Sequence, residues 1–266
     1  MKSKLITSLV VASFTAVSNA ATTVFDDSFA GFNDGALNGQ GNWGSQGVFS
    51  VAGGFATANA SGTFARALRF GQFRPEVGDQ VRITVSGFSI TEFAGNGTEQ
   101  FRIGIQALPE NSGNVTPQVG ANVALTAGNS LSIGGATDTA YNLGDNLTVL
   151  LTFTRTAADA WSLDSQISNL TDTSIFTGSA APTNLPGNST STPQAGTSSN
   201  GDTLGNYLDE NLDNRAQFGM RLQANTTNSR FNIGGVKLEL IPVPEPSSSV
   251  VLLSALMIGL LRRNRC

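Results

Sequence analysis

Alternation of apolar and polar residues with a period of two recurs along this 266-residue chain. This alternation constrains the fold more than any other feature of the sequence. Successive side chains of a β-strand point to opposite faces, so the pattern predicts strands with one buried and one solvated face. The clearest segments are residues 81–86, 101–105, 147–155, 161–163, 218–222 and 231–240. No stretch between residues 21 and 241 has the apolar spacing of a three-turn helix, so we expect an all-β protein.

The number of predicted strands favours two packed sheets. Shorter candidate strands lie at 48–51, 55–58, 64–70, 123–126 and 174–176. Each strand needs a cover for its apolar face, which two antiparallel sheets provide for each other. We therefore expect one antiparallel β-sandwich over residues 21–241. The Ser-, Thr-, Asn-, Gly- and Pro-rich stretch 178–206 is expected to be a long loop, because too few strands follow it to build a second core.

Composition excludes several kinds of chemistry. The chain has no His and one Cys, so it can form neither a Ser-His-Asp nor a Cys-His couple. A thiolate zinc cluster and an intrachain disulfide are excluded for the same reason. The net charge of −4, without basic clusters, argues against a nucleic-acid partner.

The N-terminus has the pattern of an export signal. Lys2 and Lys4 precede an uncharged apolar stretch over residues 5–17, and a small-x-small site follows at residues 18–20. This order is typical of a secretory signal peptide, with cleavage by signal peptidase between Ala20 and Ala21. We assign residues 1–20 to the signal and expect export across the inner membrane.

The C-terminus carries a short hydrophobic segment with a basic tip. An apolar run over residues 250–261 follows a Pro-Glu-Pro tripeptide. A helix over that run would be about 18 Å long, against roughly 30 Å for the hydrocarbon core of a bilayer. The terminal arginines would hold the tail on the cytoplasmic side. Because the helix is shorter than the hydrocarbon core, we expect this tail to tether the protein to the membrane only transiently. The residues that would carry this signal are Pro244, Glu245, Pro246, Arg262, Arg263 and Arg265.

Residues 242–266 resemble the PEP-CTERM sorting signal of diderm bacteria that make exopolysaccharide. The resemblance implies recognition by an exosortase near residues 244–246. It also implies a final location at the cell surface or in the extracellular (biofilm) matrix. Cys266 departs from the pattern as an extra terminal residue. Removal of both ends would shift the net charge from −4 to about −9, since most of the lost charges are cationic.

The central region resembles the concanavalin-A-like (laminin-G-like) jelly rolls. The resemblance lies in residues 24–43, in the strand pair 147–156 and 161–170, and in the closing strand 233–240, which we expect to pair near the N-terminus. It implies a β-sandwich and allows a structural calcium ion. Since some jelly rolls of this kind are glycosidases, we searched for their Glu-x-Asp-x-x-Glu strand motif, which is absent from this sequence.

No catalytic, cofactor-binding or metal-binding residues can be assigned. Glu92, Glu99 and Glu110 are isolated, although a carboxylate pair is what a glycosidase needs. The acidic group 209–213 could offer oxygen ligands to calcium, but it lacks the spacing of an EF-hand loop. A short solvated helical turn is the favoured alternative for that group.

The two tryptophans are the remaining candidates. Trp161 begins an alternating strand, which favours packing in the core. Trp43 lies among glycines and polar residues, so it could be a stacking platform for a sugar ring or a core plug. The leading hypothesis is a surface protein that associates with extracellular polysaccharide. The alternatives are a structural biofilm-matrix protein without a specific ligand and a carboxylate-dependent glycosidase.

Overall fold

The computed structural model describes residues 20–46, 49–60, 64–93, 100–108, 117–126, 129–184, 203–223 and 229–243. The predicted signal peptide before Ala20 and the predicted sorting residues from Pro244 onward lie outside these ranges. All elements named below belong to one compact unit, Ala21–Pro242.

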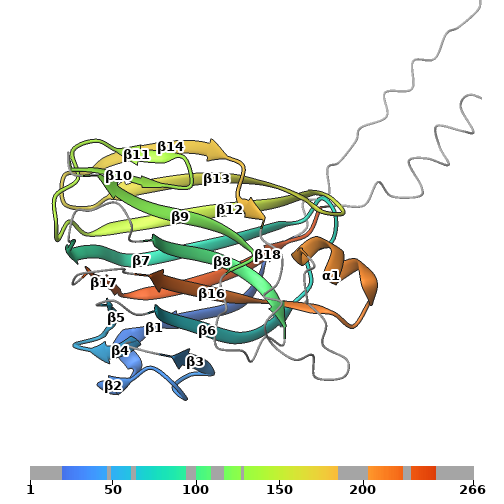
Figure 1. The fold of residues 1–266 in the computed structure, drawn as a ribbon, viewed down its shortest axis with the longest axis horizontal. Helices are drawn as coiled ribbons and strands as arrows, with labels where there is room; N and C mark the ends of the chain where they lie inside the picture. Colours follow the sequence, from blue (N-terminus) through green and yellow to red (C-terminus); the bar gives the residue numbers. More distant parts are fainter. Residues whose placement is uncertain are drawn as a thin grey trace, which may run out of the picture. The chain divides into compact units, whose positions relative to one another are not determined.

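Two antiparallel sheets make up this unit (Figure 1). The first, which we call sheet I, contains β1 (Thr22–Ser28), β2 (Gly35–Ala36), β4 (Phe49–Ala52), β5 (Phe55–Ala60), β7 (Gln80–Glu92), β12 (Leu147–Ala157), β13 (Ala160–Asn169), β14 (Ser174–Ala180), β17 (Ser229–Ile233) and β18 (Gly235–Ile241). The second, sheet II, contains β3 (Trp43–Gln46), β6 (Phe64–Phe73), β8 (Gln100–Leu108), β9 (Val119–Thr126), β10 (Ser130–Ile133), β11 (Ala136–Asp138), β15 (Thr183–Asn184) and β16 (Arg215–Gln223). A 3-10 turn, η1 (Phe29–Gly31), and one short helix, α1 (Leu204–Glu210), complete the described elements. The prediction of an all-β antiparallel sandwich is confirmed.

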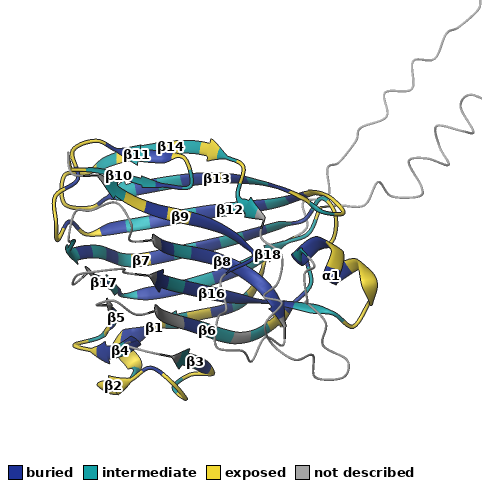
Figure 2. Ribbon diagram, in the orientation of Figure 1, coloured by how far each residue is buried: buried dark blue, intermediate teal, exposed yellow. Residues whose placement is uncertain are grey.

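The core lies between the inner faces of the two sheets. In sheet I, Val81, Ile83 and Val85 of β7 are fully buried and stand opposite inward residues of β12. In sheet II, Ile103 of β8 stands opposite Met220 of β16, and both are fully buried. Figure 2 shows buried and more exposed residues alternating along these strands, as the period-two pattern predicts.

Strand β7 organises sheet I, because one of its edges pairs with two successive strands, β17 and β18. The change of partner occurs where Gly87, at φ +62°, lies against Gly234. A Cβ added to Gly87 would lie 3.1 Å from the backbone of Gly234, so a larger residue would separate the strands there. Strand β18 also pairs with β1, Leu238 opposite Phe25. The prediction that the closing strand pairs near the N-terminus is therefore confirmed.

The structure corrects the expected loop over residues 178–206 at both ends. Strand β14 continues to Ala180, and β15 then pairs with β9 of sheet II. At the far end, α1 begins at Leu204. The polar composition concealed β15, because its partner β9 is distant in sequence. Residues 185–202 lie outside the described ranges, and no helix within those ranges is long and apolar enough to span a membrane.

Candidate functional site

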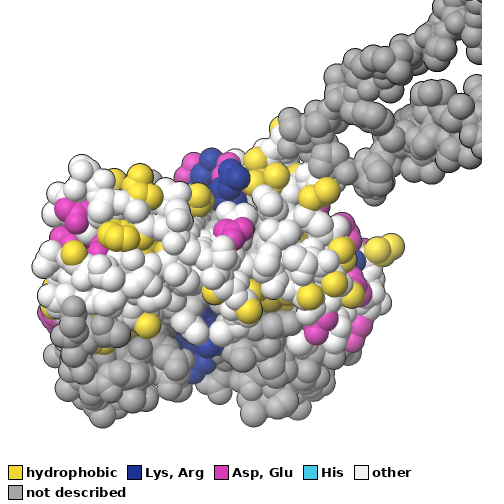
Figure 3. Space-filling view, turned by 90° about the horizontal axis from the view of Figure 1, so that it is seen from above, with side chains coloured by type: hydrophobic (Ala, Val, Ile, Leu, Met, Phe, Trp, Pro, Cys, Tyr) yellow, Lys and Arg dark blue, Asp and Glu magenta, His cyan; other side chains and the backbone are white. Residues whose placement is uncertain are grey.

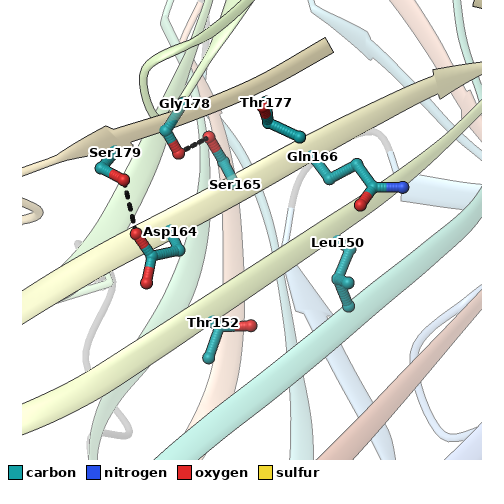
Figure 4. A pocket seen from close by; sticks show the side chains of 8 residues that line it. All are labelled: Leu150, Thr152, Asp164, Ser165, Gln166, Thr177, Gly178 and Ser179. Atoms are coloured by element: carbon teal, nitrogen blue, oxygen red, sulfur yellow. Dashed lines mark hydrogen bonds between the residues drawn. The ribbon is translucent and has the colours of Figure 1, made fainter. Parts of the chain in front are cut away.

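A cavity of about 280 Å³ lies on the outer face of sheet I (Figure 4). Strands β12, β13 and β14 form its floor, and their outward side chains supply most of the lining. The lining residues are Leu150, Thr152, Asp164, Ser165, Gln166, Thr177, Gly178 and Ser179.

Strand register brings these side chains together. Thr152, Asp164 and Ser179 stand opposite one another on the three strands and form one row. Leu150, Gln166 and Thr177 form the adjacent row, two residues further along each strand. Since residues two apart share a face, both rows point away from the core.

Hydrogen bonds hold the floor of the cavity in place. The Ser179 hydroxyl donates to Asp164 Oδ1 at 2.5 Å, joining β14 to β13 on the outer face. Beneath them, Ser165 Oγ accepts from the backbone N–H of Ala136 at 3.0 Å, which ties the β10–β11 turn to β13. A Cβ added to Gly178 would lie 2.2 Å from backbone atoms of Gly135, so β14 and this turn are in direct backbone contact. The cavity is therefore built on paired and anchored strands.

Charged side chains continue the rows beyond the cavity. Arg82 of β7 stands opposite Thr152 and, on its other side, opposite Glu239 of β18. Lys237 donates to Glu239, with the two atoms 2.8 Å apart, and this bond raises the pKa of Lys237. Arg82 Nε is buried without a hydrogen-bond partner. Figure 3 shows Lys and Arg side chains on both broad sides of the sandwich, with Asp and Glu beside them on one side.

Most of the side chains that line the cavity are polar. Hydroxyl, amide and carboxylate groups offer both donors and acceptors, which a polyhydroxylated ligand can match. Leu150 adds one apolar contact. Asp164 is the single carboxylate in the lining, whereas acid–base hydrolysis of a glycoside uses two carboxyl groups.

Trp43 is a core plug in the structure, which corrects its assignment as a possible sugar platform. Its side chain is 1% exposed and packs edge-on against Phe25 and Phe218. Its indole N–H donates to Asp27 Oδ2 at 2.8 Å. Because both ring faces are covered by protein, no sugar can stack on them. Trp161, 8% exposed, is in the core as predicted.

The acidic group 209–213 is partly helical, since α1 ends at Glu210. Asp209 pairs with Arg155 at 2.8 Å, and Leu212 is exposed. In the described part of the chain, no three His, Cys, Asp or Glu side chains come together in a way that could hold a metal ion.

Sequence reasoning missed the residues of the cavity. Asp164 and Gln166 lie on a strand that the alternation predicts, and their outward direction follows from the same pattern. Their neighbours on β14 could not be inferred, because the pairing of β13 with β14 sets which residues face one another.

Comparisons with known proteins support the fold. No model of a protein family and no curated protein matches the sequence. Solved structures of lectins do match. Lectin II from Ulex europaeus aligns with a TM-score of 0.51 at 11% identity, over 84% of this chain and 99% of the lectin. A structure described as lectin UEA-II complexed with galactose aligns with a TM-score of 0.50 at 10% identity, over 84% and 99%. The sandwich is thus of the legume-lectin, concanavalin-A-like type.

Proposed function

We propose that this protein is exported, processed at its C-terminus by an exosortase, and retained at the cell surface or in the extracellular matrix. There its β-sandwich associates with extracellular polysaccharide. The cavity on the outer face of sheet I supports this proposal most directly, because hydroxyl, amide and carboxylate groups converge there on an anchored floor. Hydrogen bonds of this kind recognise sugar hydroxyls.

Two further observations agree with the proposal. The solved structures of similar fold are described as lectins, one of them in complex with galactose. The order of signal peptide, folded domain, Pro-Glu-Pro, apolar run and arginine tip accounts for both ends of the chain. A structural matrix protein without a ligand is the main alternative, and it would leave the cavity without a role.

Binding to glycans tests the proposal. The secreted protein is applied to a glycan array and to the producer's own exopolysaccharide, with and without calcium. Replacement of Asp164 by Asn removes the charge of the carboxylate, and replacement of Gln166 by Ala removes an amide; each change weakens a polar contact worth about 1 kcal/mol. We expect the affinity for the bound glycan to fall by at least about fivefold.

The matched control is Asp213→Asn, which removes an exposed carboxylate in the turn after α1. It should leave binding within about twofold of the unaltered protein, since it removes charge without touching the cavity. Flat responses on every glycan would refute carbohydrate binding. Equal losses in the cavity variant and the control would refute the assignment to the cavity.

A further inference from the structure

Two rows of outward side chains leave the cavity and cross the rest of sheet I. Strand β14 is an edge of this sheet, so the rows continue only on the other side, over β7, β18 and β1. Together with the cavity they cross six strands, which at about 4.8 Å per strand is about 24 Å. Register places six residues in the added part, none of them buried, and we call them the extension rows: Arg82, Glu239 and Thr23 in one row, and Thr84, Lys237 and Asp26 in the other.

The cavity alone has room for only a short piece of a polymer. Its volume of about 280 Å³ is just below the usual range of small-molecule pockets, about 300–1,000 Å³. Its floor spans three strands, about 10 Å across. A longer ligand held there must continue over a neighbouring surface or project into solvent. The extension rows adjoin the cavity directly, because Arg82 and Thr84 stand opposite Thr152 and Leu150.

Arg82 is the charged group of the extension rows that lacks a protein partner. Its Nε is buried without a hydrogen-bond acceptor, and within the described ranges it makes no ion pair. Glu239, the carboxylate opposite it, is paired with Lys237, with the two atoms 2.8 Å apart. Lys237 in turn stands opposite Asp26. The other charges of these rows therefore compensate one another, and Arg82 keeps unused N–H donors.

The terminal nitrogens of Arg82 are placed to meet a ligand. Arg82 is half-buried, and Nε is its only nitrogen that is both buried and without a partner. Nε is thus covered by protein, while the terminal nitrogens reach the surface. A guanidinium is always charged and donates from a planar fork, and hydrogen bonds from a charged donor are stronger than those between neutral groups. A ligand that leaves the cavity over β12 meets these donors next, two strands or about 10 Å from Asp164.

We propose that the protein binds an internal stretch of a linear polysaccharide, which lies across the strands from the cavity to Arg82. This inference rests on the proposed function and names the class of ligand: a continuous chain several sugars long, rather than a single terminal sugar. Asp164 and Gln166 would contact one sugar in the cavity. Arg82 and Thr84 would donate to oxygen atoms of a sugar further along the chain. Once the first sugar is bound, the second contact forms within one complex, so affinity rises with chain length until both contacts are made.

The length of the bound chain tests this inference. The producer's exopolysaccharide is partly hydrolysed and separated by size into fragments, from single sugars to long oligomers. Titration calorimetry then measures the affinity of the secreted protein for each fragment, corrected for the number of equivalent positions along it. We expect affinity to rise at least about tenfold from single sugars to fragments that reach Arg82, and then to level off.

Arg82→Gln removes the outer contact and leaves the cavity unchanged. It should lower the affinity for long fragments at least about fivefold and keep the affinity for single sugars within about twofold. The matched control is Arg230→Gln. Arg230 stands opposite Glu92 at the far end of β7, and its Nε is also buried without a partner. It lies about 30 Å from Arg82 along the strand, so its charge is screened from the rows, and affinity for every fragment should stay within about twofold.

A second variant keeps the test decisive if Arg82→Gln fails to fold. Thr84→Val removes a hydroxyl beside Arg82 and keeps a β-branched side chain, which suits a strand. We expect about threefold weaker binding of long fragments, unchanged binding of single sugars and an unchanged melting temperature.

The inference would be overturned by affinity that does not change with length, or by equal losses for short and long fragments in Arg82→Gln. Equal losses in Arg82→Gln and Arg230→Gln would also overturn it. The proposed function survives each of these results, because single sugars still bind the cavity. Absence of binding at every length refutes the proposed function and this inference with it. Asp164→Asn combined with Gln166→Ala should weaken short and long fragments alike.

Discussion

At the scale of single residues, Tyr141 shows how one buried hydroxyl stabilises the sandwich. Its side chain is 1% exposed, and its hydroxyl accepts from the N–H of Ile90 at 2.9 Å and lies 3.2 Å from the Ile90 carbonyl oxygen. Tyr141→Phe leaves that buried N–H unsatisfied, so we expect a loss of about 1–3 kcal/mol in unfolding free energy at neutral pH. Urea denaturation of the unaltered protein and of Tyr141→Phe measures this difference in unfolding free energy.

The same residue predicts a pH dependence. Burial raises the pKa of Tyr141 to about 12. The hydrogen bond with the Ile90 backbone lowers this pKa by a smaller amount, and the charges of Asp145 and Asp138 raise it. A raised pKa means that the neutral form is favoured in the folded state. This contribution is complete below pH 10, the ordinary tyrosine value, and is lost between pH 10 and about 12. The unaltered protein should therefore lose stability more steeply over that range than Tyr141→Phe. Parallel curves of unfolding free energy against pH for the two proteins would contradict this prediction.

At the scale of elements, Arg155 attaches α1 to the sandwich. Its guanidinium, fully buried, donates to the carbonyls of Pro75, Ala158 and Gly205 at 2.7–3.1 Å and pairs with Asp209. Arg155→Met would leave these carbonyls unsatisfied. We expect a loss of about 3 kcal/mol or more, with α1 exposed to hydrogen exchange before the strands.

The control for this prediction is Arg230→Met. Arg230 is half-exposed, and its pair with Glu92 spans 3.7 Å, so its removal should cost less than about 1 kcal/mol. Equal stability of the two variants, or unchanged protection of residues 204–210 in Arg155→Met, would rule out the attachment.

At the scale of the whole molecule, the proposed processing predicts the mass of the mature protein. Material recovered from the native producer should begin at Ala21 and lack the apolar run and arginine tip, because a helix over residues 250–261 is too short for a stable membrane span. Intact-mass spectrometry measures both cleavages and any group added at the new C-terminus.

The sorting proposal requires that the tail be removed. Protein from the producer that still carries Arg262 to Cys266 would refute it. A strain lacking the processing enzyme is the matched control, and it should accumulate the uncleaved chain in the membrane fraction.

Local pattern was enough for the fold class but not for the candidate sites. The alternation identified β7 and β12 and the direction of their side chains, and the core positions of Val81 and Ile83 followed. The position of Trp43 could not be decided, because its burial depends on Phe25 and Phe218, both distant in sequence. The burial of Arg155 was likewise hidden, since its partners come from three separate segments.

The sequence by itself determined the strands, the face each presents to the core, and the need for two sheets to cover one another. These follow from side-chain alternation, which is a local property of the backbone. Only the tertiary structure decided which outward residues meet. Asp164 joins Ser179, and Arg82 joins Thr152, through the register between strands. That register depends on backbone pairing and core packing across the whole sandwich.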